Sequence, residues 1–175
     1  MIYLILGPSG AGKDRLSLSL LERGIPKLIS HTTRLPREGE CEGVNYYYVN
    51  HKRFAHLPMI ESTEYASNFY GTSRAEVDRV LSSGGNAFAI LDRHGVEEFK
   101  RIYGDSVKVI YIYANSKVLA AHMRAQGRSE DDIAERLIHA IKSGEFDNLE
   151  VADYCIVNSG SIEKAIAQLR AIVGM

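Results

Sequence analysis

A glycine-rich segment near the N-terminus has the residue spacing of a phosphate-binding loop. It consists of Gly7, Pro8, Ser9, Gly10, Ala11, Gly12, Lys13 and Asp14. The segment fits the pattern G-x-x-x-x-G-K, and it lies between a short apolar run and a helical pattern. Such glycines let backbone N–H groups turn towards an anion, the helix N-terminus adds partial positive charge, and Lys13 adds a full charge. These residues predict a binding site for the phosphates of ATP.

Position 14 departs from this pattern. Phosphate-binding loops of this kind place Ser or Thr there, and the hydroxyl binds the magnesium ion of the nucleotide. The carboxylate of Asp14 is also a hard oxygen ligand that Mg²⁺ accepts, although it adds negative charge near the triphosphate. A first-turn acid favoured by the helix dipole is an equally good interpretation. The sequence leaves both roles open and predicts Mg²⁺ as the cofactor that accompanies ATP.

A second set of polar residues is suited to a small phosphorylated acceptor. Arg34 and Arg37 lie three apart in a turn-rich stretch, so their guanidinium groups can converge on one phosphate. The hydroxyls of Tyr46 and Tyr70 suit the same oxygens, with aromatic packing as the alternative. Glu61 can accept hydrogen bonds from guanine N1–H and the 2-amino group, which adenine does not offer. The alternative for Glu61 is a surface acid.

The order of these motifs along the chain resembles the guanylate kinase family. The resemblance rests on TTRLPREGE at 32–40, GVNY at 43–46, IE at 60–61, NFYGTS at 68–73, DRHG at 92–95, the segment 127–137 and ADYCIVN at 152–158. It implies ATP-dependent phosphorylation of GMP to GDP. It also implies that GMP contacts Ser30, Arg34, Arg37, Tyr46, Glu61, Tyr70, Gly71, Thr72 and Asp92.

Asp92 ends an apolar run and therefore has a second interpretation. An aspartate at such a strand end holds the water shell of magnesium in many phosphate-loop enzymes. The family usually carries an acid-x-acid pair at this point, but position 90 is Ile90. The sequence therefore does not support a role that needs an acid at position 90.

The charged stretch 126–148 is expected to form a mobile helical flap, with Ser129 as the N-cap residue. The resemblance makes Arg136 the best candidate to reach the transferring phosphate, together with Lys13. Arg124 and Arg128 are weaker catalytic candidates, because the family's arginine just before the flap glycine is Gln126 here. Asn158 is expected to line the adenine side of the ATP site.

Strands and helices alternate along most of the chain, which predicts a parallel sheet covered by helices. The expected strands are 2–6, 27–30, 86–91, 107–113 and 154–157. The expected helices are 13–22, 74–81, 96–102, 117–125 and 161–173. We therefore expect a three-layer α/β P-loop NTPase fold in one domain. Its core would comprise 1–33, 83–123 and 149–175, with an acceptor-binding insertion at about 34–82 and a helical lid at about 124–148. The turn-rich part of the insertion, 34–70, is expected to consist of short strands.

The composition is that of a globular protein of 175 residues with a formal net charge of −1. No global basic field favours nucleic acid or a membrane surface, so the expected partners are ATP and GMP alone, in a monomer or homodimer. The apolar runs have strand length, well short of the roughly 20 residues of a membrane helix. Cys41 and Cys155 are far apart and are expected to be free thiols of a cytoplasmic protein.

Two other functions compete with GMP phosphorylation. The run G-P-S-G-x-G-K-D also resembles the loop of ribose 1,5-bisphosphate phosphokinases, which phosphorylate a sugar phosphate. A non-catalytic guanylate-kinase-like binding module is the second alternative. The guanine-reading residues argue against the first alternative, and the retained Gly12 and Lys13 argue against the second.

Overall fold

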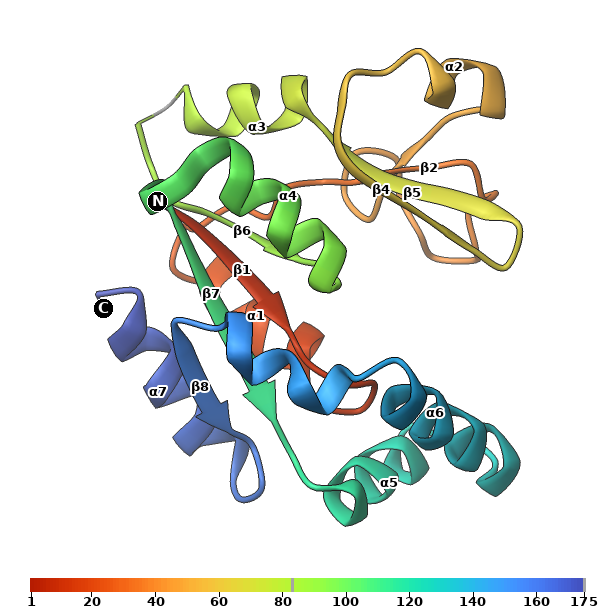
Figure 1. Ribbon diagram of the computed structural model, residues 1–175, viewed down its shortest axis with the longest axis vertical. Helices are drawn as coiled ribbons and strands as arrows, with labels where there is room; N and C mark the ends of the chain where they lie inside the picture. The colour runs from red at the N-terminus through yellow and green to blue at the C-terminus, as the bar shows by residue number, and fades with distance from the viewer. Residues whose placement is uncertain (83, 175) are drawn as a thin grey trace.

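A computed structural model describes residues 1–82 and 84–174, and its strands form two four-stranded sheets (Figure 1). The first sheet has the order β6-β1-β7-β8, and its paired strands are all parallel. Its strands are β1 (Ile2–Leu6), β6 (Ala87–Ile90), β7 (Val107–Tyr113) and β8 (Tyr154–Val157). The expected α/β fold with a parallel sheet is therefore confirmed.

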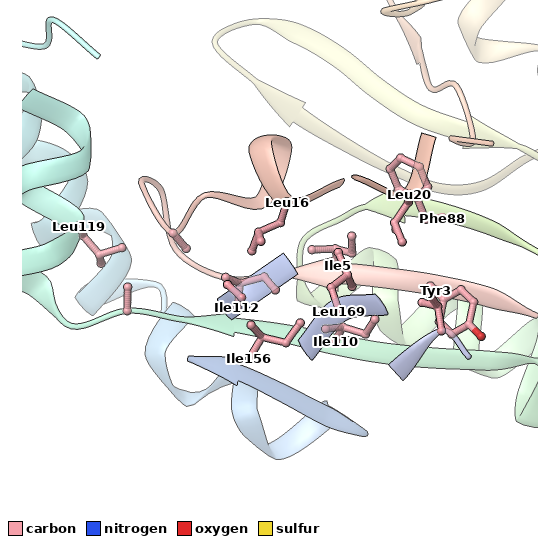
Figure 2. Close-up of a cluster of buried hydrophobic side chains, with 14 of the residues drawn as sticks. Tyr3, Ile5, Leu16, Leu20, Phe88, Ile110, Ile112, Leu119, Ile156 and Leu169 are labelled. Carbon is pink, nitrogen blue, oxygen red and sulfur yellow. The ribbon is translucent and has the colours of Figure 1, made fainter. Parts of the chain in front are cut away.

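Alternate residues of β1 pack into two separate cores because successive side chains of a strand point to opposite faces. Tyr3 and Ile5 belong to the cluster drawn in Figure 2, together with residues of α1 (Lys13–Leu21) and α7 (Ile162–Ile172). Ile2, Leu4 and Leu6 belong to a second cluster, which α3 (Arg74–Leu81) and α4 (Arg93–Tyr103) cover. Helices thus lie on both faces, as a parallel sheet requires.

The second sheet has the order β3-β2-β5-β4 and lies beyond α4, which packs against β4 (Figure 1). Its strands are β2 (His31–Thr32), β3 (Tyr47–Tyr48), β4 (Met59–Tyr65) and β5 (Asn68–Ser73). Ile60 of β4 is buried in the same cluster as the second face of the parallel sheet, so a continuous apolar core joins the two sheets. This shared core fixes the residues that are expected to bind the acceptor relative to the phosphate loop.

Three details differ from the sequence expectations. The expected strand 27–30 is wrong, because it forms only an isolated parallel bridge between Lys27 and Phe88. Beyond that bridge, the Ile29 N–H donates to the Glu76 carboxylate at 2.9 Å and the Ser30 carbonyl accepts the Tyr47 N–H, so the chain turns to the second sheet. The segment 34–70 also contains a short helix, α2 (His51–Ala55), capped by Asn50. Finally, β2 pairs within the second sheet although 1–33 was expected in the core. Residue 83, which begins one expected core range, and residue 175, which ends another, lie outside the described residues.

The expected flap consists of the turn that follows α5 (Ser116–Ala125), then α6 (Glu130–Lys142) and the start of a 3₁₀ segment, Glu145–Val151. The Ser129 side chain accepts a hydrogen bond from the Asp132 N–H at 3.3 Å, so the predicted N-cap is confirmed. A second 3₁₀ turn, Gly104–Ser106, precedes β7. Among residues 1–82 and 84–174, no helix combines the length and apolarity of a membrane span. Cys41 and Cys155 are both free and exposed.

Candidate active site

The predicted site residues gather where the parallel strands end. Gly7 follows β1, Asp92 lies two residues after β6, and Asn158 directly follows β8. Carboxyl ends of parallel strands meet at one edge of a sheet, and ligands of open α/β sheets bind outside that edge. Residues separated by as many as 150 positions therefore face a common region for purely topological reasons.

The phosphate loop has the backbone form that its glycines permit. Gly12 is the N-cap residue of α1 and has φ of 90°, a left-handed conformation that disfavours a side chain. Gly7 approaches the backbone of β7 so closely that a Cβ atom would collide with the Ile112 carbonyl oxygen. The Lys13 ammonium group donates hydrogen bonds to the carbonyls of Gly7 at 2.6 Å and Pro8 at 3.1 Å. Lys13 is thereby held directly over the loop.

The environment of Lys13 favours phosphate binding. Burial lowers the pKa of Lys13, and the negative charges of Asp14 and Glu145 act in the opposite direction. Lys13, Asp92 and Glu145 line one cavity, which extends along the end of β6. A buried ammonium group with little water around it gains more from an incoming phosphate than an exposed one does.

Two side chains from other elements hold the loop in place. Asn158 is buried, and its Nδ2 donates to the Ala11 carbonyl at 2.9 Å. His122 on α5 forms a hydrogen bond between its Nδ1 and the Gly10 carbonyl at 2.8 Å. Both residues also line a cavity beside Gly10 and Gly12.

The residues expected at the acceptor phosphate line a second cavity. Its walls include Arg34, Arg37, Tyr46, Tyr70 and Asp92. The rings of Tyr46 and Tyr70 meet edge to face with centroids 5.8 Å apart, and the Arg34 guanidinium carbon lies 5.5 Å from the Tyr46 centroid. Burial raises the pKa of Tyr46, so its hydroxyl keeps the proton that it would donate to a phosphate.

The residues expected to read guanine form a buried polar group on neighbouring strands. Glu61 and Thr72 are partners in the antiparallel pair of β4 and β5, and both are buried. The Ser30 and Thr72 hydroxyl oxygens are 3.2 Å apart. Burial raises the pKa of Glu61, and bonds from Thr72 lower it again in part. Gly71 lies next to Thr72, where a Cβ atom would come within 2.6 Å of the Glu61 carbonyl oxygen.

Asp92 links the two parts of the site. It lines both the cavity beside Lys13 and the acceptor cavity, and its charge contributes to the raised pKa of Glu61. Its Oδ1 accepts the Gly95 N–H at 2.8 Å and caps α4. The side chain of Ile90, where the family usually has an acid, packs against the apolar core instead.

The three arginines expected in the lid are paired with acids of α6. Arg124 bonds Glu130 at 2.7 Å, and Arg128 bonds Asp132 at 2.9 Å. Arg136 also bonds Asp132, at 2.8 Å, and its Nη1 lies 3.5 Å from the Ser9 hydroxyl of the phosphate loop. The hydrogen bonds of the described chain therefore extend from Arg136 to the phosphate loop, whereas those of Arg124 and Arg128 stay within the lid.

Sequence reasoning assigned no site role to several residues that the fold brings there. His139 lines the cavities on both sides of the site, and its spacing of three from Arg136 on a helix was the available signal. Glu40 lies inside the acceptor cavity and is part of the TTRLPREGE motif. His122 and Glu145 carry no such signal, because only tertiary packing brings them to the loop.

Among the described residues, no group of three or more His, Cys, Asp or Glu side chains could hold a metal ion. The described residues therefore provide no cluster of protein ligands that could surround a cation. The exposed carboxylate of Asp14 stands alone at the start of α1. That donor set suits an ion such as Mg²⁺, which takes most of its ligands from nucleotide phosphates and water.

A strand–loop–helix phosphate site beside a polar acceptor cavity and a helical arginine flap defines a P-loop nucleotide kinase. The sequence model of the guanylate kinase family matches residues 1–174. The chain belongs to this family.

Individual relatives agree with that assignment. A guanylate kinase from Shewanella denitrificans is 33% identical over 180 residues, which cover 98% of this chain and 86% of the relative. A guanylate kinase from Escherichia coli K12 is 34% identical over 182 residues with the same coverage. The crystal structure of guanylate kinase from Anaplasma phagocytophilum has a TM-score of 0.72 and 26% identity, and covers 99% of this chain and 83% of its own.

Proposed function

We propose that this chain transfers the γ-phosphoryl group of ATP to GMP and releases ADP and GDP. A GMP phosphate oxygen forms a bond to the γ-phosphorus, and the bond from that phosphorus to the β,γ-bridging oxygen breaks. The observation that carries the proposal is the pairing of two sites. A cavity with two arginines and two tyrosines lies beside a buried Glu61–Thr72 pair, and Asp92 connects it to the loop of Lys13.

On the donor side, we assign the ATP phosphates to the loop Gly7–Asp14. Inward backbone N–H groups and the Lys13 ammonium group would stabilise the charge on the β- and γ-phosphates. Asn158 would line the adenine side. Its Nδ2 already bonds the Ala11 carbonyl, so its remaining oxygen acts as an acceptor for a donor group on the base.

On the acceptor side, the phosphate of GMP would lie among Arg34, Arg37, Tyr46 and Tyr70. Its guanine would lie against Glu61, with Ser30, Gly71, Thr72 and Asp92 completing the GMP site. The Glu61 carboxylate accepts from both N1–H and the 2-amino group, whereas adenine has an unprotonated N1 and no 2-amino group. Adenine would offer this buried carboxylate no donor along that edge of the base, which strongly disfavours AMP.

The lid would complete the site on closure. In this division of the chain, a core holds ATP, the segment of about 34–82 holds GMP, and the segment of about 124–148 closes over the phosphates. Arg136 would supply positive charge to the transferring group, with Arg124 and Arg128 in weaker supporting roles. Exclusion of water by the closed lid would prevent idle hydrolysis of ATP.

Mg²⁺ is the expected cofactor, and Asp14 is the residue that would hold it. When bound with ATP, Mg²⁺ would supply positive charge against the negative charge of the phosphates. Asp14 lies next to Lys13 at the start of α1, where a serine or threonine would otherwise supply the ligand.

An acceptor screen tests the proposed function. ADP release would be measured with GMP, dGMP, AMP, UMP and ribose 1,5-bisphosphate at fixed ATP and Mg²⁺. We expect turnover with GMP well above that with AMP, UMP and ribose 1,5-bisphosphate. Equal turnover of AMP and GMP would contradict the role of Glu61. Faster turnover of ribose 1,5-bisphosphate than of GMP would identify the sugar phosphate as the acceptor instead of GMP.

Arg37→Lys is expected to raise the KM for GMP by about tenfold or more. Lysine keeps the charge but loses the planar fork that binds two phosphate oxygens at once. Initial rates at varied GMP and saturating ATP would measure the effect. Unchanged kinetics in the folded variant would assign Arg37, which is exposed, to the surface rather than to the phosphate.

Asp14→Ala is expected to raise the magnesium concentration needed for half-maximal rate, and Asp14→Ser to recover much of the activity. A serine hydroxyl restores the usual ligand of the ion. The measurement is a magnesium titration at fixed ATP. Calorimetric titration of the three proteins with Mg²⁺, in the presence of a non-hydrolysable ATP analogue, measures Mg²⁺ binding without turnover.

Superimposable titration curves for the three proteins would remove Asp14 from the metal site. Asp14 would then act only as a first-turn acid of α1. Both substitutions would lower the free energy of unfolding by similar amounts, about 0.3–1 kcal/mol.

A further inference from the structure

The carboxylate of Glu40 lies inside the acceptor cavity and is bound to Arg34, the first of the two proposed phosphate-binding arginines. Arg34 Nη1 donates to Glu40 Oε2 and Arg34 Nη2 donates to Glu40 Oε1, both at 2.9 Å. The side chains are only 14% and 19% exposed, respectively. Two parallel bonds of this kind fix the plane of a guanidinium group as well as its position.

The guanidinium N–H groups of Arg34 that bond Glu40 and Leu35 determine which of its donors remain for a ligand. Nη1 also donates to the Leu35 carbonyl at 2.8 Å, so three of the five guanidinium N–H groups are engaged by Glu40 and Leu35. The other two belong to Nε and Nη2, which lie on one edge of the guanidinium plane and point in the same direction. That edge is a second fork, and its two donors match two oxygens of a phosphate.

Glu40 also binds two groups that lie next to Arg34. Its Oε2 accepts the Arg37 N–H at 2.8 Å and the Tyr48 hydroxyl at 2.9 Å. A single carboxylate thus joins the Arg34 side chain, the backbone at Arg37 and the edge strand β3. The hydrogen bond with Glu40 is the main cause of the raised pKa of Arg34, and the interaction of Tyr70 with the same guanidinium raises it further.

We propose that Glu40 is a positioning residue for GMP, which clamps one edge of the Arg34 guanidinium so that its Nε–Nη2 edge faces the acceptor phosphate. The inference rests on the proposed function and adds a residue that does not itself touch the substrate. The guanidinium is ordered before GMP arrives, so less side-chain entropy is lost on binding.

An acid beside a phosphate site needs a physical reason, because a lone carboxylate would repel the ligand. Glu40 occupies the Nη1–Nη2 end of Arg34, next to the Nε–Nη2 edge rather than on it, and four donors surround its oxygens. The Arg34 guanidinium holds the pKa of Glu40 at about 2, so the clamp stays ionised throughout the pH range of an enzyme assay. Its geometric benefit is expected to exceed the repulsion, which the four donors largely neutralise.

The test is the isosteric change Glu40→Gln, with a double-mutant cycle against Arg34→Ala. The glutamine amide cannot accept both guanidinium donors. We expect the KM for GMP to rise about tenfold, with the KM for ATP unchanged, as for the loss of a charged hydrogen bond. In the Arg34→Ala background, Glu40→Gln should change the KM for GMP by less than about twofold, because the group that it positions is absent.

Two controls separate positioning from a general effect on the loop. Guanosine has the base but no phosphate, so its inhibition constant against GMP should be the same in Glu40→Gln and in the original protein. Glu42→Gln is the matched variant, since Glu42 accepts the Tyr48 N–H at 2.9 Å on the same loop and does not bond Arg34. Glu42→Gln should leave the KM for GMP within about twofold.

The outcomes distinguish the clamp from the proposed function. If Arg34→Ala raises the KM for GMP but Glu40→Gln does not, the clamp is wrong and the phosphate site stands. If Arg34→Ala has no effect, the proposed phosphate site itself fails. Additive effects of the two substitutions, or an equal loss of guanosine binding, would show that Glu40 only stabilises the loop and would overturn the proposal.

Discussion

Arg136→Ala is expected to lower kcat by about 100- to 1000-fold, with little change in the KM for either substrate. Phosphoryl transfer depends on positive charge around the transferring group rather than on covalent chemistry by the protein. Arg136 is the lid arginine with a contact to the phosphate loop, 3.5 Å from the Ser9 hydroxyl, and Asp132 orients it through Nε. Single-turnover kinetics with GMP and ATP would measure the chemical step directly.

Arg128→Ala is the matched control for this prediction. Arg128 shares Asp132 with Arg136 and lies in the same lid, but its hydrogen bond does not leave the lid. The control substitution should lower kcat by less than about tenfold. Equal losses in the two variants would assign the effect to lid stability, and no loss in Arg136→Ala would remove Arg136 from the reaction.

Glu61→Gln is expected to reduce kcat/KM for GMP by roughly 10- to 100-fold, about 1.5–3 kcal/mol. In the proposed GMP site the buried carboxylate accepts from two guanine donors, whereas an amide supplies one oxygen and a mismatched NH₂ group. Guanosine binding should weaken by a similar factor, because the lost contact involves the base. A variant with undiminished GMP turnover would make Glu61 a structural acid of the second sheet.

The pH dependence of GMP use follows from the same carboxylate. Burial raises the pKa of Glu61 above its ordinary value, and only the ionised form accepts both guanine donors. The KM for GMP should therefore rise as the pH falls through this raised pKa. The ratio of kcat/KM between the original protein and Glu61→Gln should shrink over the same range. The GMP phosphate titrates equally in both proteins, so its effect cancels in the ratio, and a flat ratio would contradict the assignment.

Local sequence patterns predicted most of the architecture. The run of apolar residues before Gly7 and the leucines after Lys13 predict the strand–loop–helix unit that the structure contains. Such patterns are reliable because burial on both sheet faces demands apolar strands, and a phosphate loop demands glycines at fixed spacing. The expected strand 27–30 failed because its apolar pattern cannot report that the Ile29 N–H bonds the distant Glu76 and that the Ser30 carbonyl bonds Tyr47, which leaves a single bridge to Phe88.

The acceptor residues were also readable in part. Arg34 and Arg37 could be proposed as a phosphate pair because their spacing is local and few other functions need two arginines there. Their partner could not be assigned a role in the same way. Glu40 is six residues from Arg34, and only the folded loop shows that its carboxylate takes the Nη1–Nη2 end of that guanidinium and not its Nε–Nη2 edge.

The fold class, the phosphate loop and the family could be predicted from the sequence, since each is encoded in short motifs and hydrophobic periodicity. Tertiary structure alone decided which groups meet across long separations. His122 reaches the carbonyl of Gly10, and Glu145 comes to lie in the cavity of Lys13. These approaches depend on how α5 and the 3₁₀ segment after α6 pack against the sheet. That packing sums many weak apolar contacts over the whole chain, so no local pattern records it.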